Sequence, residues 1–211
     1  MNPLTPINAS AVNKAFLVAI LLSAHVGRAE DGSEFRVFDG TVKFVAAANV
    51  SIFTVHGQSR EMTGSLMLVK GERRIELQNI RARINPKSFK TGISLRDEHM
   101  RRKIFSLAND TTPELEFVSD RITCPELPQG RDAACPVSGQ LTLRGVTRPF
   151  AISLKVLNDG KGYRITAEGG LKLSDFGIEP PCQLGVCVTD DVKLNFEFQA
   201  RETSSLAGGP R

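Results

Sequence analysis

The sequence has no tryptophan, one tyrosine and three histidines, and its formal net charge is only +4. A nucleic-acid-binding protein normally gathers Lys and Arg on one stripe with aromatic residues between them, whereas here the basic residues alternate with Asp and Glu. No Gly-x-Ser-x-Gly sequence is present to supply a hydrolase nucleophile. His25 falls in a segment expected to be removed, which leaves His56 and His99 for any Ser-His-Asp mechanism. These shortages argue against a nucleic-acid partner and against common hydrolytic chemistry.

A long apolar run is also missing. The run at residues 15–22 follows Lys14 and is too short to span a bilayer on its own. Gly27-Arg28-Ala29 places small residues where a signal peptidase reads, so we interpret residues 1–29 as a secretory signal peptide, with an uncleaved anchor as the alternative. Residues 30–202 then form one domain, and residues 203–211 are expected to be a disordered tail. The expected location is the periplasm or the cell exterior, by Sec-type bacterial export.

Four cysteines lie in the exported part: Cys124, Cys135, Cys182 and Cys187. They indicate an oxidising compartment, and three pairings are possible. Each of the intervals 124–135 and 182–187 falls in proline-rich, loop-like sequence, so we predict two local bridges on loops, Cys124–Cys135 and Cys182–Cys187. Neither pair has the spacing of a zinc site, and no histidine is near enough to complete one. We therefore expect no metal and no cofactor.

From Phe35 onward, apolar residues recur with a period of two, and turn signals such as Arg144-Gly145 separate the runs. Such alternation predicts strands with one face in water, which excludes a parallel sheet buried on both faces. A change of parity between Leu77 and Ile80 predicts a bulge near Asn79. About eight to nine strands are counted. A single antiparallel sheet with an apolar face must close on itself or pack against a partner sheet. A closed barrel of about eight strands has an interior that is filled by side chains or holds one small ligand.

The stretch around residues 95–106 is the exception, because it reads as a helix. Ser94 and Asp97 have the spacing of a capping box, and Asp97 and Glu98 precede Arg101 and Arg102 in the order favoured for helical ion pairs. Pro113 prevents the helix from continuing. We expect a short helix inserted between strands, near one end of the barrel.

Several motifs in this order resemble the YceI-like family of lipid- and polyisoprenoid-binding proteins. They are Asn85-Pro86, Lys90-Thr91-Gly92, Arg96-Asp97-Glu98-His99-Met100, Thr112-Pro113-Glu114, Phe117, Gly139-Gln140-Leu141-Thr142-Leu143-Arg144-Gly145-Val146-Thr147-Arg148-Pro149 and Ser174-Asp175-Phe176-Gly177-Ile178. The resemblance covers roughly residues 35–201. It implies an exported, lipocalin-like antiparallel barrel that holds a long apolar chain. The family pattern does not require the four cysteines.

The apolar face of the alternating strands is the candidate binding site. We expect the cavity to be lined by Phe44, Phe53, Leu66, Leu77, Phe117, Leu141, Ile152 and Phe196, with Leu95, Met100 and Phe176 near its ends. Arg96, His99 and Arg101 are expected at the mouth, where they would contact a lipid headgroup. A solid core filled by the same residues is the alternative. His99 is more readily explained by helix docking than by catalysis, and Asp175 by an Asx-type turn that places Phe176 in the core.

We therefore predict an all-β, eight-stranded, lipocalin-like barrel that binds an amphiphilic lipid, with a polyisoprenoid favoured, for transport, storage or sensing. The partner would be that lipid, with no nucleic acid, transient membrane contact and an open oligomeric state that includes a dimer. The alternative is an envelope structural or stress protein with a filled barrel and a protein partner. A lipid-acting enzyme that uses His99 is the third hypothesis, and we expect no catalytic residue.

Overall fold

The computed structural model describes residues 32–50, 52–71 and 74–203. The expected signal peptide, and residues 204–211 of the expected tail, lie outside the described residues. Within the described part of the chain, no helix is long and apolar enough to cross a membrane.

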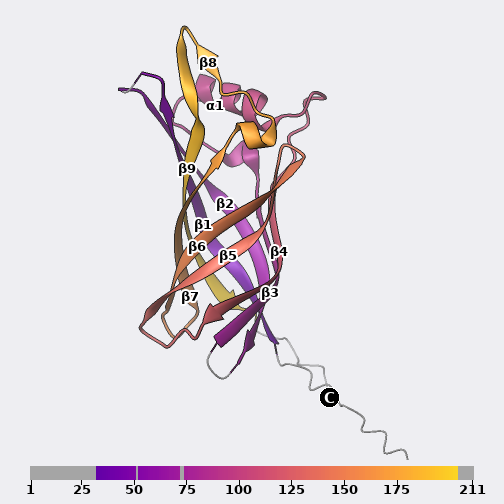
Figure 1. The fold of residues 1–211 in the computed structure, drawn as a ribbon, viewed down its shortest axis with the longest axis vertical. Helices are drawn as coiled ribbons and strands as arrows, with labels where there is room; N and C mark the ends of the chain where they lie inside the picture. Colours follow the sequence, from indigo (N-terminus) through magenta and orange to yellow (C-terminus); the bar gives the residue numbers. More distant parts are fainter. Residues whose placement is uncertain (1–31, 51, 72–73, 204–211) are drawn as a thin grey trace, which may run out of the picture.

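Eight long strands form one closed antiparallel barrel, as the alternation and the family resemblance together predicted (Figure 1). They are β1 (Gly32–Ala48), β2 (Thr54–Lys70), β3 (Arg74–Ile84), β4 (Leu115–Pro125), β5 (Asp132–Leu143), β6 (Val146–Asn158), β7 (Tyr163–Lys172) and β9 (Val186–Glu202). Neighbours in sequence pair with each other, and β1 also pairs with β9, which closes the sheet. The short β8 (Cys182–Gln183) forms a hairpin with the start of β9.

The expected irregularity at Asn79 is present. Asn79 has a φ of 52°, a left-handed conformation that Asn tolerates better than most residues. Because this residue interrupts the alternation, Leu77 before it and Ile80 after it both face the barrel interior. One residue out of register thus keeps both halves of β3 apolar on the same side.

Four short helical segments lie at one end of the barrel, called here the helix end (Figure 1). They are η1 (Pro86–Ser88), α1 (Ser94–Met100), the π-helical turn η2 (Arg101–Phe105) and η3 (Ser174–Phe176). The predicted helix is therefore present, but the predicted capping box is wrong. Ile93 is the N-cap residue and its side chain makes no capping bond, because Asp97 turns inward to Thr91 instead. The expected Glu98–Arg102 ion pair forms at 3.4 Å.

Both disulfides pair as predicted. The expectation that both lie on loops is wrong, because Cys182 and Cys187 belong to the β8–β9 hairpin and Cys124 and Cys135 belong to β4 and β5. The side chains of Cys124 and Cys135 are 2% and 0% exposed, and they sit in the core. The β4–β5 ladder covers only the three residues Glu116 to Val118 of β4, so the disulfide joins these strands where no ladder does.

Candidate functional site

The barrel encloses an apolar cavity of about 200 Å³. All eight long strands contribute to its wall, and only Ser65, Arg81 and Tyr163 among the lining residues carry polar side-chain atoms. The Arg81 side chain is 57% exposed and pairs with Glu116, so its charge lies outside the wall. Apolar cavities of roughly 150 Å³ stay dry and bind small hydrocarbons, whereas pockets for drug-sized ligands span about 300–1,000 Å³. The space therefore accepts a segment of an apolar chain, and little else.

Six of the eleven residues expected at the cavity line its wall: Leu66, Leu77, Phe117, Leu141, Ile152 and Phe196. They come from six different strands, so the alternation correctly assigned their faces.

The other five lie outside the cavity. Phe53 and Leu95 are 51% and 58% exposed, because each belongs to a segment at the helix end where strand parity no longer applies. Phe44 does face inward, but its ring packs against Phe89 at a centroid distance of 5.8 Å in a filled layer. Phe176 and Met100 belong to the same apolar cluster. The expectation that Phe44 and Phe53 line the cavity is thus not met.

The filled layer closes the helix end of the barrel. Phe89 stacks on Phe105 with ring centroids 5.6 Å apart and planes 16° apart. Phe176 and Ile178, after β7, are 3% and 1% exposed in the same cluster. These side chains come from separate segments after β3 and β7, and not from the barrel wall. Neither Phe89 nor Phe105 was predicted to take part in this closure, although Phe89 is a single apolar residue in an otherwise polar stretch.

Leu127 closes the opposite end, where β1 begins and β9 ends. It is 7% exposed, lines the cavity, and accepts a hydrogen bond at its carbonyl from Asn158 Nδ2 at 2.9 Å. Phe35 and Tyr163 pack beside it in the same cluster region, with ring centroids 5.5 Å apart. Burial raises the pKa of the Tyr163 phenol, and the charge of Glu202 raises it further. Leu127 was missed because it stands in a loop between two prolines.

Arg96, one of the three residues expected at the mouth, anchors α1 to the segment that precedes it. Arg96 donates to Thr91 twice, from Nε to the hydroxyl at 2.9 Å and from Nη2 to the carbonyl at 2.8 Å. The Thr91 backbone N–H and hydroxyl both donate to Asp97 Oδ1, at 2.7 Å and 2.5 Å. Burial alone would raise the pKa of Asp97, but these two bonds, with the charges of Lys90 and Arg101, hold it below its usual value. Thr91, Arg96 and Asp97 therefore form a charged hydrogen-bond network that fixes the start of α1 to the segment before it.

His99 and Arg101 are half-buried on the same helical segment. Among the described residues, no three His, Cys, Asp or Glu side chains are grouped closely enough to hold a metal. Arg148 Nε donates to the backbone carbonyl of Asp175 at 2.7 Å. The Asp190 carboxylate accepts hydrogen bonds from the backbone N–H and the hydroxyl of Ser174. Phe176 is buried as expected, and the turn that places it depends on Asp190 rather than on an Asx bond from Asp175.

Comparison with known proteins gives a consistent result. A family model described as the YceI-like domain matches residues 33–200. A UPF0312 protein of Pseudomonas paraeruginosa is 34% identical over 131 residues, which cover 59% of this chain and 64% of that protein. The chain thus spans a little under two thirds of that relative. A UPF0312 protein of Pseudomonas syringae pv. syringae is 30% identical over 149 residues, 68% of this chain and 72% of its own length.

Solved structures share the barrel. A polyisoprenoid binding domain from Saccharophagus degradans superposes with a TM-score of 0.59 at 17% identity, covering 80% of this chain and 98% of that one. BcnA of Burkholderia cenocepacia gives a TM-score of 0.58 at 19% identity, covering 76% and 95%. At these identities the likeness establishes the fold.

Proposed function

This chain belongs to the YceI-like domain family, and from that premise we propose that it is an exported protein that binds a long-chain amphiphilic lipid inside its barrel. The observation that carries the proposal is the cavity inside the closed barrel, to whose apolar wall all eight long strands contribute. A solved domain of the same fold is described as polyisoprenoid binding, which favours an isoprenoid chain. The two disulfides favour an oxidising compartment, and hence export.

The size of the cavity limits how the lipid binds. Burying a chain of about twenty carbons would contribute roughly 16 kcal/mol at about 0.8 kcal/mol per methylene, against association costs of about 4–15 kcal/mol. The 200 Å³ resting cavity is too small for such a chain. Part of the barrel must therefore open or expand when a long lipid enters.

The helix end is better suited to open than the opposite end. Its closure is made by Phe89, Phe105 and Phe176, which come from separate segments packed on one another. At the opposite end, Cys124–Cys135 and the Asn158–Leu127 hydrogen bond fix the closing loop to the wall. We propose that the apolar tail of the lipid enters through the filled layer and that the lipid headgroup remains near Arg101 and His99.

Organic extraction of the purified protein, followed by mass spectrometry, tests the proposal. We expect about one long-chain lipid per protein, retained through purification or taken up from added polyprenols or fatty acids. A protein that is clean after purification and ignores both kinds of added lipid would contradict it. The filled-barrel alternative expects that negative result. A lipid-acting enzyme predicts turnover that His99→Ala abolishes, whereas a binding protein yields the same intact lipid with either residue.

A further inference from the structure

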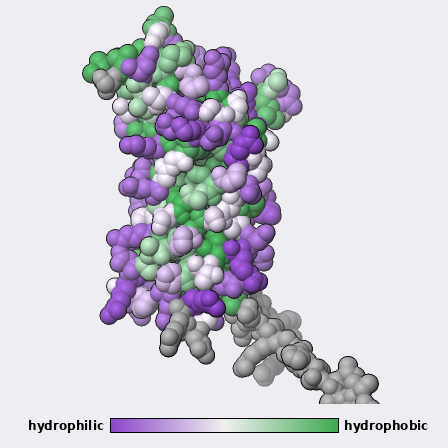
Figure 2. Space-filling view, viewed as in Figure 1, coloured by the Kyte–Doolittle hydropathy of each residue, from purple (hydrophilic) through white to green (hydrophobic). Residues whose placement is uncertain are grey.

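The most exposed apolar side chains gather at the helix end. Leu95 and Ile93, at the start of α1, are 58% and 53% exposed. Leu184, 97% exposed, lies at the tip of the β8–β9 hairpin, and Ile52, Phe53 and Val50, which are 82%, 51% and 38% exposed, lie in the loop after β1. Both segments project beyond the barrel at the end that carries α1 (Figure 1), and green side chains mark both tips in Figure 2.

Leu184 is poorly explained by folding. Its φ is 51°, a left-handed conformation that Gly or Asn adopts with less strain than Leu. Because the side chain is 97% exposed, it packs against almost nothing in the fold. A residue that is unfavourable in both respects indicates a contact outside the chain.

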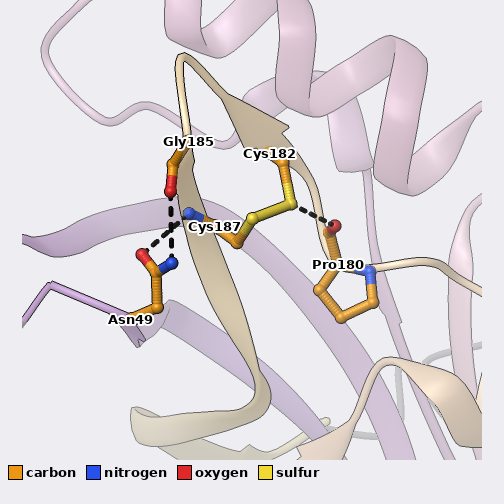
Figure 3. The surroundings of a disulfide bond; sticks show 5 residues. All are labelled: Asn49, Pro180, Cys182, Gly185 and Cys187. Carbon is orange, nitrogen blue, oxygen red and sulfur yellow. Dashed lines mark hydrogen bonds between the residues drawn. A yellow bond between two sulfur atoms is a disulfide. The ribbon is translucent and has the colours of Figure 1, made fainter.

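Hydrogen bonds from Asn49 join the two projecting segments (Figure 3). Asn49, from the loop after β1, donates from Nδ2 to the carbonyl of Gly185 at 3.2 Å and accepts from the backbone N–H of Cys187 at 3.0 Å. The Asn49 backbone N–H also donates to the Cys187 carbonyl at 2.8 Å. The Cys182–Cys187 disulfide closes the hairpin itself. The exposed apolar residues are therefore presented in a fixed arrangement, as preformed binding surfaces are.

Charge is distributed unevenly around these tips. The sequence has no charged residue at 46–55 or at 181–189. The segment 85–107, which holds η1, α1 and η2, has six basic and two acidic residues, a net charge of +4. Of the two acids, Asp97 is buried against Thr91, and Glu98 pairs with Arg102. Uncharged apolar tips beside a basic segment match an anionic lipid surface, whose headgroups attract Lys and Arg and whose interior accepts apolar side chains.

We propose that the helix end docks on an anionic lipid bilayer, with Leu184, Ile52 and Phe53 inserted below the headgroups and Arg102 and Lys103 against them. A bilayer accepts separate protruding side chains without matching pockets, which a protein partner would have to provide. This inference rests on the proposed function, because docking would place the filled layer at the helix end against the membrane from which the lipid is taken.

Flotation with vesicles of equimolar phosphatidylcholine and phosphatidylglycerol tests this docking. Leu184→Asn removes the apolar side chain at a φ that Asn tolerates, so it should weaken vesicle partitioning about tenfold while thermal stability is unchanged or raised. Phe38→Ser is the matched control: Phe38 is 46% exposed on the β1 wall, and its loss should leave partitioning unchanged. The double substitution Arg102→Ser and Lys103→Ser should weaken binding to these vesicles and remove most of its salt dependence.

Three results would overturn the docking inference. They are a native protein that does not float with the vesicles, a Leu184→Asn variant that floats as well as the native protein, and self-association that depends on Leu184 in a protein that ignores vesicles. Lipid content is measured separately. A protein that contains lipid but does not bind vesicles contradicts the docking inference alone. A protein that contains no lipid but floats with the vesicles supports the docking inference and contradicts the proposed function.

Discussion

Ala82→Leu gives opposite results for a hollow and for a filled barrel. Ala82 lines the cavity on β3, and its partners in register are Gly64, which has no side chain, and Phe117. Val37 fills the space on the Gly64 side, where its Cγ2 would lie 3.1 Å from a Gly64 Cβ, so room for a larger side chain at position 82 comes from the cavity alone. Leu adds three carbon atoms, and burying them should contribute about 2 kcal/mol at roughly 0.8 kcal/mol per carbon. If the interior were already filled, the same atoms would cost about 1–3 kcal/mol by overpacking.

The assay is urea unfolding of delipidated protein with both disulfides intact. With an m-value of about 2 kcal/mol/M, the expected stabilisation raises the midpoint by about 1 M with little change in slope. The same substitution should lower the yield of copurified lipid, because it fills space that the tail would occupy. Ala46→Leu is the control, since Ala46 is 4% exposed in the filled cluster and does not line the cavity. A destabilised Ala82→Leu variant, no better than Ala46→Leu, would refute a hollow interior.

Three further predictions concern single features of the barrel. Tyr163, the only tyrosine, should titrate above pH 10 when its ionisation is followed by absorbance at 295 nm. The free energy of unfolding should fall as the pH rises through this folded-state pKa, because a raised pKa stabilises the fold only at lower pH. A normal titration would show that the phenol is solvated. Asp97→Asn should lower the free energy of unfolding by about 1–3 kcal/mol. Because the folded-state pKa of Asp97 is lowered, the substitution should also remove part of the stability loss seen as the pH falls below about 4. Urea titrations that show the same loss of stability at acid pH in both proteins would contradict this. Replacing Cys124 and Cys135 by Ala should cost about 3 kcal/mol for a loop of separation 11, and a loss below about 1 kcal/mol would show that β4 and β5 hold together without the bridge.

The sequence predicted the barrel well because each strand keeps one face in water. That requirement makes apolar residues recur at every second position of a strand. The irregularity at Asn79 could be predicted from the change in parity between Leu77 and Ile80. The local disulfide pairing was also confirmed. These features depend on residues close together in sequence.

Depth along the barrel could not be predicted, because parity assigns a face and nothing more. Phe44 and Leu66 both face inward, yet only Leu66 reaches the cavity, since Phe89 from a distant loop packs against Phe44. The placement of Leu127 likewise depends on Asn158, which is 31 residues away. Long-range contacts of this kind leave no local signal.

Proline misled the interpretation of the sequence around Cys135. Pro136 lies within β5, opposite the part of β4 that makes no ladder with it. A proline can occupy a strand where one side needs no N–H donor. The sequence around Cys135 therefore resembled a loop although it forms the barrel wall.

Mass spectrometry of the intact protein, purified without organic solvent and desolvated under non-denaturing conditions, tests the central claim most directly. We expect a population heavier than the polypeptide by the mass of one long-chain lipid, and a smaller heavy population for Ala82→Leu. A single species at the polypeptide mass, both as purified and after incubation with polyprenol, would contradict the claim that the barrel holds a lipid.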